Sequence, residues 1–188
     1  MLHPSYPIAT ERLRLRPFRG DDLDALHAIQ SRPDVARYLY WEPRSRAAVR
    51  DALAERTRQA TVEKEGDKLV LAVERRDTRT LIGDVNLLWL SREHRQGETG
   101  FVLHPDHHGH GFAAEAARAM LGLGFELLGL HRIIGRCDGR NAASMRVMEK
   151  LGMRREAHLR QNEIVKGEWT DEIVYAMLSA EWRRSNSP

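Results

Sequence analysis

Apolar residues recur along the chain with two different periods, and the period indicates which segments are strands. Leu13 and Leu15 alternate with arginines near the N-terminus, a spacing that places apolar side chains on one face of a strand. Later segments are apolar and rich in β-branched residues, with a turn-like stretch between two of them. The predicted strands in this part of the chain are 11–18, 69–75, 81–90 and 98–103.

Other segments repeat their apolar residues every three to four positions, which predicts helices. The predicted helices are one opening at Asp21 and ending before Pro33, one at 45–64, one at 112–128 and one at 141–150 that stops at Gly152. A strand at 131–138 and a hairpin within 163–178, turning at Lys166 and Gly167, complete the pattern. The order β-α-α-β-β-β-α-β-α-β-β indicates a mixed α+β or three-layer α/β fold.

Length and composition narrow the class of protein. The 188 residues are 41% hydrophobic and 30% charged, which predicts one folded domain over 1–188. No apolar run approaches the roughly 20 residues that span a bilayer, and the N-terminus has no apolar signal core. A single cysteine excludes a disulfide within the chain. We therefore expect a cytoplasmic protein with no membrane partner.

Basic residues outnumber acidic ones slightly, 30 to 27, and 26 of the 30 are arginines. The calculated isoelectric point is 9.3. Arginine pairs well with phosphate, but these residues are spread over the whole chain, without a basic block interleaved with aromatics. A genome coding bias towards arginine also explains the excess of arginine over lysine, and no nucleic-acid partner is expected.

The most informative segment is a predicted strand that runs through a glycine turn into a helix. Gly109 and Gly111 allow positive φ and a close approach of the backbone to a ligand. The first turn of the following helix offers unpaired N–H groups and a partial positive charge, which together bind phosphate. A plain strand-to-helix connection is the alternative.

Two well-known phosphate loops fit this segment poorly. A Walker loop needs Gly-Lys-Ser/Thr, whereas Phe112 and Ala113 follow Gly111. Gly109, Gly111 and Ala114 formally satisfy a dinucleotide fingerprint. However, Asp138 follows at more than the usual distance of about 20 residues, and a β-meander precedes the loop. Too little chain follows for the rest of a dinucleotide-binding fold.

A third type of phosphate loop matches in several segments. Residues 104–116 read HPDHHGHGFAAEA and 141–153 read NAASMRVMEKLGM. Residues 10–16 read TERLRLR, and 167–171 read GEWTD ahead of Tyr175. These four segments, in this order, resemble the GNAT N-acetyltransferase superfamily, most of all its Rim-type branch, which acetylates ribosomal-protein N-termini. Three positions before the first glycine of the loop, the broader superfamily prefers Gln or Arg, whereas this chain has Asp106.

The resemblance implies a mostly antiparallel sheet with one splayed strand pair and flanking helices. It also implies an enzyme that transfers an acetyl group from acetyl-CoA to a primary amine by direct attack in a ternary complex. The amine belongs to a protein N-terminus or a small molecule, and a homodimer is one assembly to test. A non-catalytic acyl-CoA-binding protein stays open as an alternative.

The resemblance assigns roles to particular residues. Catalytic roles fall to Glu98 as general base and to Ser144 as acid or thiolate stabiliser. Acetyl-CoA would bind at Val102, Leu103, His108, Gly109, His110, Gly111, Phe112, Ala113, Asn141 and Ser144, and the acceptor at Tyr38 and Trp41. Arg136, Arg140 and Arg146 are candidates for the 3′-phosphate.

Each role has a structural alternative. Glu98 could be a solvated carboxylate at a strand edge, and Asn141 is first of all a helix N-cap. Ser144 is equally a polar residue of the capping region, and the two aromatics are equally core residues. Glu115 and Met120 are expected to be structural. Cys137 lies in an apolar strand without a neighbouring base, which indicates a buried structural thiol.

A metal-binding protein is the alternative to an enzyme. His104, His107, His108 and His110 cluster with Asp106, and imidazole suits zinc or nickel. Adjacent loop histidines rarely converge on one ion without further ligands, so no metal is expected.

Overall fold

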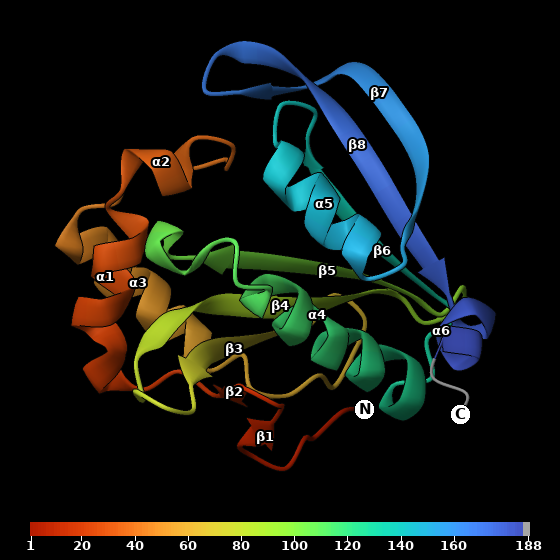
Figure 1. The fold of residues 1–188 in the computed structure, drawn as a ribbon, viewed down its shortest axis with the longest axis horizontal. Coiled ribbons are helices and arrows are strands. Elements are labelled where there is room, and N and C mark those ends of the chain that lie inside the picture. The colour runs from red at the N-terminus through yellow and green to blue at the C-terminus, as the bar shows by residue number, and fades with distance from the viewer. Residues whose placement is uncertain (186–188) are drawn as a thin grey trace.

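A central eight-stranded sheet organises the computed structural model, which describes residues 1–185. The spatial order of strands is β1-β2-β3-β4-β5-β6-β8-β7 (Figure 1). Neighbours are antiparallel except for the parallel pair β5–β6. The strands are β1 (Ile8–Ala9), β2 (Leu13–Arg16), β3 (Lys68–Arg75), β4 (Leu81–Ser91), β5 (Gln96–Leu103), β6 (Arg132–Asp138), β7 (Arg154–Val165) and β8 (Glu168–Leu178). The predicted mixed fold with a mostly antiparallel sheet is confirmed.

Helices cover both faces of this sheet. The α-helices are α1 (Leu23–Gln30), α2 (Pro33–Ala36), α3 (Arg46–Arg56), α4 (Phe112–Gly122), α5 (Ala142–Lys150) and α6 (Ser179–Ser185). Short 3-10 turns lie at η1 (Gly20–Asp22) and η2 (Pro105–His107). Helices α1 and α3 pack together over one face, around a small cluster that includes Phe18, Leu26 and Val49. Helices α4 and α5 lie over the main core on the other face.

The sheet opens between β5 and β6, as the resemblance implies. Their pairing covers three positions and ends at Glu98 opposite Ile134. Beyond that point β5 continues to Leu103 paired with β4, while β6 continues paired with β8. The two strands therefore diverge, and a gap opens beside the second half of β5.

One predicted helix is too long, and another changes its helical type near its end. The helix expected at 45–64 ends at Arg56, because its apolar stripe is sparse and the chain then joins the sheet region. Val62 is fully buried and pairs with Leu2. The helix expected at 112–128 is α-helical to Gly122 and continues as a π-turn, η3 (Leu123–Leu127). Gly124 within this turn sits against the side chain of Ile133, where a β-carbon would lie 2.5 Å from Cδ1.

Several smaller elements were not predicted. Helix α2 begins at Pro33, which the sequence indicated as a stop but which also fits the first helical position. Strand β7 begins at Arg154, well before the expected hairpin, and β1 and α6 are additions. Among residues 1–185, no helix has the length and apolar character needed to cross a membrane.

Candidate functional site

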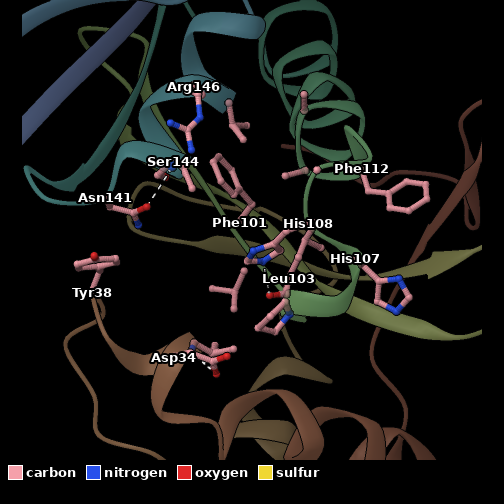
Figure 2. A pocket seen from close by; sticks show the side chains of 18 of the residues that line it. Asp34, Tyr38, Phe101, Leu103, His107, His108, Phe112, Asn141, Ser144 and Arg146 are labelled. Atoms are coloured by element: carbon pink, nitrogen blue, oxygen red, sulfur yellow. Dashed lines mark hydrogen bonds between the residues drawn. The ribbon is translucent and has the colours of Figure 1, made fainter.

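A cleft of about 700 Å³ lies where β5 and β6 diverge. Its walls are the second half of β5, the loop and first turn of α4, helix α5, and the segment around α2 (Figure 2). The lining residues are Asp34, Val35, Arg37, Tyr38, Leu39, Phe101, Val102, Leu103, Pro105, His107, His108, Gly109, Gly111, Phe112, Ala113, Ala114, Asn141, Ala143, Ser144, Arg146, Val147 and Lys150. Ten of the thirteen predicted site residues are therefore brought together. Glu98, His110 and Trp41 do not line this cleft.

The glycine loop has the backbone conformation that an anion site requires. Gly109 and Gly111 have φ of 81° and 82°, and Gly111 is the N-cap of α4 without a side-chain cap. Within residues 1–185, the backbone N–H groups of Gly109, His110 and Gly111 make no backbone hydrogen bond. The next N–H groups belong to the first helical turn and point the same way. The loop thus presents several donors toward the cleft.

Ion pairing with the N-terminal segment, through an exposed Arg12, holds this loop in place. The Glu115 carboxylate accepts hydrogen bonds from the Thr10 hydroxyl at 2.6 Å and from Arg12 Nε and backbone N–H, both at 2.7 Å. Arg12 also donates to the carbonyl oxygen of His110 at 2.9 Å. Burial would raise the pKa of Glu115, but these hydrogen bonds outweigh it and lower the pKa. Glu115 is structural, as expected, and it fixes the loop geometry.

The histidines of the loop point in different directions. His104 Nδ1 accepts from the Asp106 N–H at 3.3 Å, and His108 Nε2 lies 3.0 Å from the Leu103 carbonyl oxygen. His107 lines the edge of the cleft beside Phe112 (Figure 2), and burial and Arg75 lower its pKa. Within the described part of the chain, no three His, Cys, Asp or Glu side chains converge to hold a metal.

Helix α5 presents one face to the cleft. Asn141 is its N-cap, and its Oδ1 accepts from the Ser144 N–H at 3.0 Å. Figure 2 shows both side chains at the cleft, with Tyr38 below Asn141 in this view. The same face carries Arg146 and Lys150. Lys150 was not predicted as a site residue. It follows Arg146 by four residues and Val147 by three, and this helical spacing is the sequence signal that could have identified it.

Two of the three arginines expected near the coenzyme do not reach the cleft. Arg140 is paired with Asp138 at 2.8 Å and with Glu168 at 3.3 Å. Arg136 lies on β6 in a cluster of carboxylates, with Glu98 at 3.2 Å and Glu172 at 3.0 Å. Only Arg146 of these three lines the cleft. The linear clustering was misleading because strand residues project to faces that their neighbours in sequence do not share.

Glu98 lies at the last paired position of β5, on the opposite face from Phe101. Phe101 packs against the core beneath α4 and α5, whereas Val102, on the Glu98 face, packs against the α1–α3 cluster. Glu98 therefore faces the α1–α3 side of the sheet. The cleft is lined from both faces, by Phe101 and Leu103 on one and by Val102 and Val35 on the other.

The two aromatic residues predicted to bind the acceptor, Tyr38 and Trp41, lie in different environments. Tyr38 lines the cleft, with the guanidinium groups of Arg37 and Arg140 5.1 Å and 5.9 Å from its ring. Trp41 instead stacks with Arg44 at 4.7 Å. The α2 segment supplies other lining residues that carry no motif, and Val35 and Leu39 could not be identified from sequence. Cys137 is half-buried, and burial raises the pKa of its thiol to about 11, which leaves it a weak nucleophile.

Comparison with known proteins identifies the family. The acetyltransferase (GNAT) domain family matches residues 12–154. The uncharacterized N-acetyltransferase YnaD of Bacillus subtilis (strain 168) is 36% identical over 175 residues, covering 93% of this chain and 98% of that protein. Spermidine N(1)-acetyltransferase of Escherichia coli (strain K12) is 25% identical over 167 residues, covering 86% of this chain and 83% of that protein.

Solved structures that resemble this chain indicate the same family. A GNAT-family acetyltransferase from Bacillus anthracis superposes with a TM-score of 0.83 at 34% identity, covering 93% of this chain and 99% of that one. A candidate ribosomal-protein-serine acetyltransferase from Vibrio cholerae gives 0.79 at 25% identity, covering 94% and 99%. Together with the splayed strands and the glycine loop, these matches show that the chain belongs to the GNAT family of acetyltransferases.

Proposed function

We propose that this chain, as one domain over 1–188, transfers an acetyl group from acetyl-CoA to a primary amine by direct attack in a ternary complex. One observation carries the proposal: the cleft opens where β5 and β6 diverge, and Glu98 lies at the last position at which the two strands pair. A thioester in the cleft and an amine on the Glu98 side can therefore meet at the gap without a covalent enzyme intermediate.

The donor side supplies groups suited to acetyl-CoA. The N–H groups of the glycine loop would hold the pyrophosphate, with the basic side chains of Arg146 and Lys150 on the facing helix. The unpaired edge of β5 at Val102 and Leu103 would bind the pantetheine arm by backbone hydrogen bonds. The Asn141 amide Nδ2 is free to contact the same arm, since its Oδ1 caps α5.

The chemistry needs two proton transfers. Glu98 takes one proton from the ammonium group, and the free amine attacks the thioester carbonyl carbon. As the new C–N bond forms and the C–S bond breaks, the nitrogen gives up its second proton and the departing sulfur takes one, so that the coenzyme leaves as a thiol. Ser144, at the cleft wall, would relay this proton: its hydroxyl donates to the sulfur and takes the nitrogen's proton in exchange, while Glu98 releases its own proton to solvent.

Two acceptor classes follow from different observations. The Rim-type motifs favour a protein N-terminus, in line with the candidate ribosomal-protein-serine acetyltransferase among the similar structures. Similarity to a spermidine acetyltransferase instead favours a small polyamine. A homodimer and a cytoplasmic location complete the proposal. The metal-binding and non-catalytic alternatives are not favoured.

The deciding experiment measures coenzyme A thiol release from acetyl-CoA with a panel of amines. The panel contains spermidine, other small amines and short peptides with different N-terminal residues, and mass spectrometry identifies the acetylated product. We expect thiol release that depends on the acceptor. Acetyl-CoA binding without turnover on any amine would instead support the non-catalytic alternative.

A further inference from the structure

We propose that Lys166, in the turn between β7 and β8, is a positioning residue that latches the α2 segment over the acceptor side of the cleft. The α2 segment is defined as residues 33–42. This inference rests on the proposed acetyl transfer, because it concerns how the acceptor reaches the gap between β5 and β6.

The latch is a set of contacts between segments far apart in sequence. The Lys166 ammonium donates to the Ala36 carbonyl oxygen at 2.7 Å and lies 3.6 Å from a Glu42 carboxylate oxygen. The Tyr40 hydroxyl donates to the Glu163 carboxylate on the same hairpin. Figure 1 shows the β7–β8 hairpin extending beyond the sheet toward the α2 segment. The hairpin thus holds the segment at two points.

The backbone of the turn points to a role for the Lys166 side chain. Lys166 and Gly167 have φ of 54° and 83°, as in the two-residue turns that join adjacent strands. The first of these positions favours Asn, Asp or Gly, which enter the left-handed region at least cost. A lysine there is unfavourable for the turn itself, and in return its ammonium reaches Ala36.

The latch holds Arg37 and Tyr38, which line two cavities. A second cavity of about 230 Å³ lies between the α2 segment and the hairpin, lined by Arg37, Tyr38, Arg140, Val165, Lys166 and Glu168. Arg37 and Tyr38 also line the large cleft. Release of Lys166 would therefore move Arg37 and Tyr38 and enlarge the smaller cavity, which we assign as the acceptor entrance, while the glycine loop and α5 proposed to hold the coenzyme stay in place.

Replacement of Lys166 by Met tests the latch, because it removes the ammonium group but keeps a stem of similar length. We expect amide hydrogen exchange within 36–42 to accelerate roughly ten-fold, the effect of losing one charged hydrogen bond, while exchange in α4 is unchanged. Lys166→Arg should restore slow exchange. Lys64→Met, in an exposed turn, is the matched control. Unchanged exchange in the Lys166→Met variant would overturn the latch.

Kinetics test the acceptor role. With spermidine and an N-terminal serine peptide as acceptors, Lys166→Met should raise the acceptor KM roughly ten-fold. Acetyl-CoA affinity, measured by calorimetry, should change less than two-fold, and Lys166→Arg should recover the KM. An unchanged acceptor KM, or an equal loss of acetyl-CoA affinity, would contradict the assignment. Absence of thiol release from the wild-type protein would instead refute the proposed function, while the exchange measurement would still decide the latch.

Discussion

The two sides of the cleft are built in different ways. The proposed donor side is built largely of backbone: a glycine loop, a helix N-terminus and a strand edge, held by the Glu115–Arg12 pair. The proposed acceptor side is built of side chains from segments far apart in sequence, such as Lys166, which contacts the Ala36 carbonyl, and Arg136, which pairs with Glu98. A common coenzyme can be recognised by a fixed backbone, whereas acceptor specificity depends on side chains that vary freely.

The electrostatics differ in the same way. On the donor side, hydrogen bonds to Glu115 lower its pKa and keep it charged. On the acceptor side, burial raises the pKa of Glu172, with Glu163 and Glu98 adding to the effect and Arg136 opposing it. Carboxylates thus outnumber cations around Arg136, and the side on which the amine is proposed to bind is the more acidic.

The largest effect is expected at Glu98. Glu98→Gln keeps the shape of the side chain but removes the base, so kcat should fall roughly 100-fold or more, the usual contribution of general base catalysis. Steady-state thiol release with saturating amine measures it, and Glu93→Gln in an exposed turn is the control. A rate within two-fold of wild type would return Glu98 to the role of a strand-edge carboxylate paired with Arg136.

On the donor side, Gly111→Val should weaken acetyl-CoA binding roughly 100-fold. A branched side chain at φ of 82° is strained by about 1–3 kcal/mol, and its β-carbon would lie 3.2 Å from Lys150 Nζ. Calorimetry with acetyl-CoA measures the loss. Gly66→Val provides a matched control, because Gly66 also has positive φ, 90°, but lies outside the cleft. Equal affinity in the wild-type and Gly111→Val proteins would remove the loop from the binding site.

Smaller effects should separate the two roles at the start of α5. Asn141→Ala removes the cap and should destabilise the protein by about 1 kcal/mol, in addition to slowing turnover. Asn141→Asp should restore the cap but not the amide donor. Ser144→Ala should reduce kcat roughly ten-fold with little change in stability. Denaturant unfolding and thiol release together test this, and unaltered rates in all three variants would make both residues structural.

The smallest effect concerns pH and the anchoring of the loop. The folded-state pKa of Glu115 is lowered, so its contribution to stability is present above the ordinary value near 4.5 and is lost as pH falls through the folded pKa. Glu115→Gln should therefore be less stable than wild type at pH 7, and the difference should shrink below about pH 4.5. Urea unfolding across this range measures it. A difference that is constant with pH would contradict the assignment.

Much of the fold could be predicted because it depends on local patterns. Alternation at Leu13 and Leu15 identified β2, and the glycine turn followed by an alanine-rich stripe identified the start of α4. Asn141 was correctly expected to cap α5. Errors occurred where long-range packing overrides local preference, as at Val62, which extends the chain beside Leu2 instead of continuing a helix.

The amino-acid sequence was enough to predict the order of the longer strands and helices, the family resemblance and the glycine loop, because glycine conformations and helix termini are properties of a few adjacent residues. Tertiary structure decided which arginine faces the cleft, that Glu98 lies where β5 and β6 diverge, and that Lys166 reaches Ala36. These facts depend on how the sheet opens and on where the β7–β8 hairpin ends in space. No spacing along the chain encodes such distances.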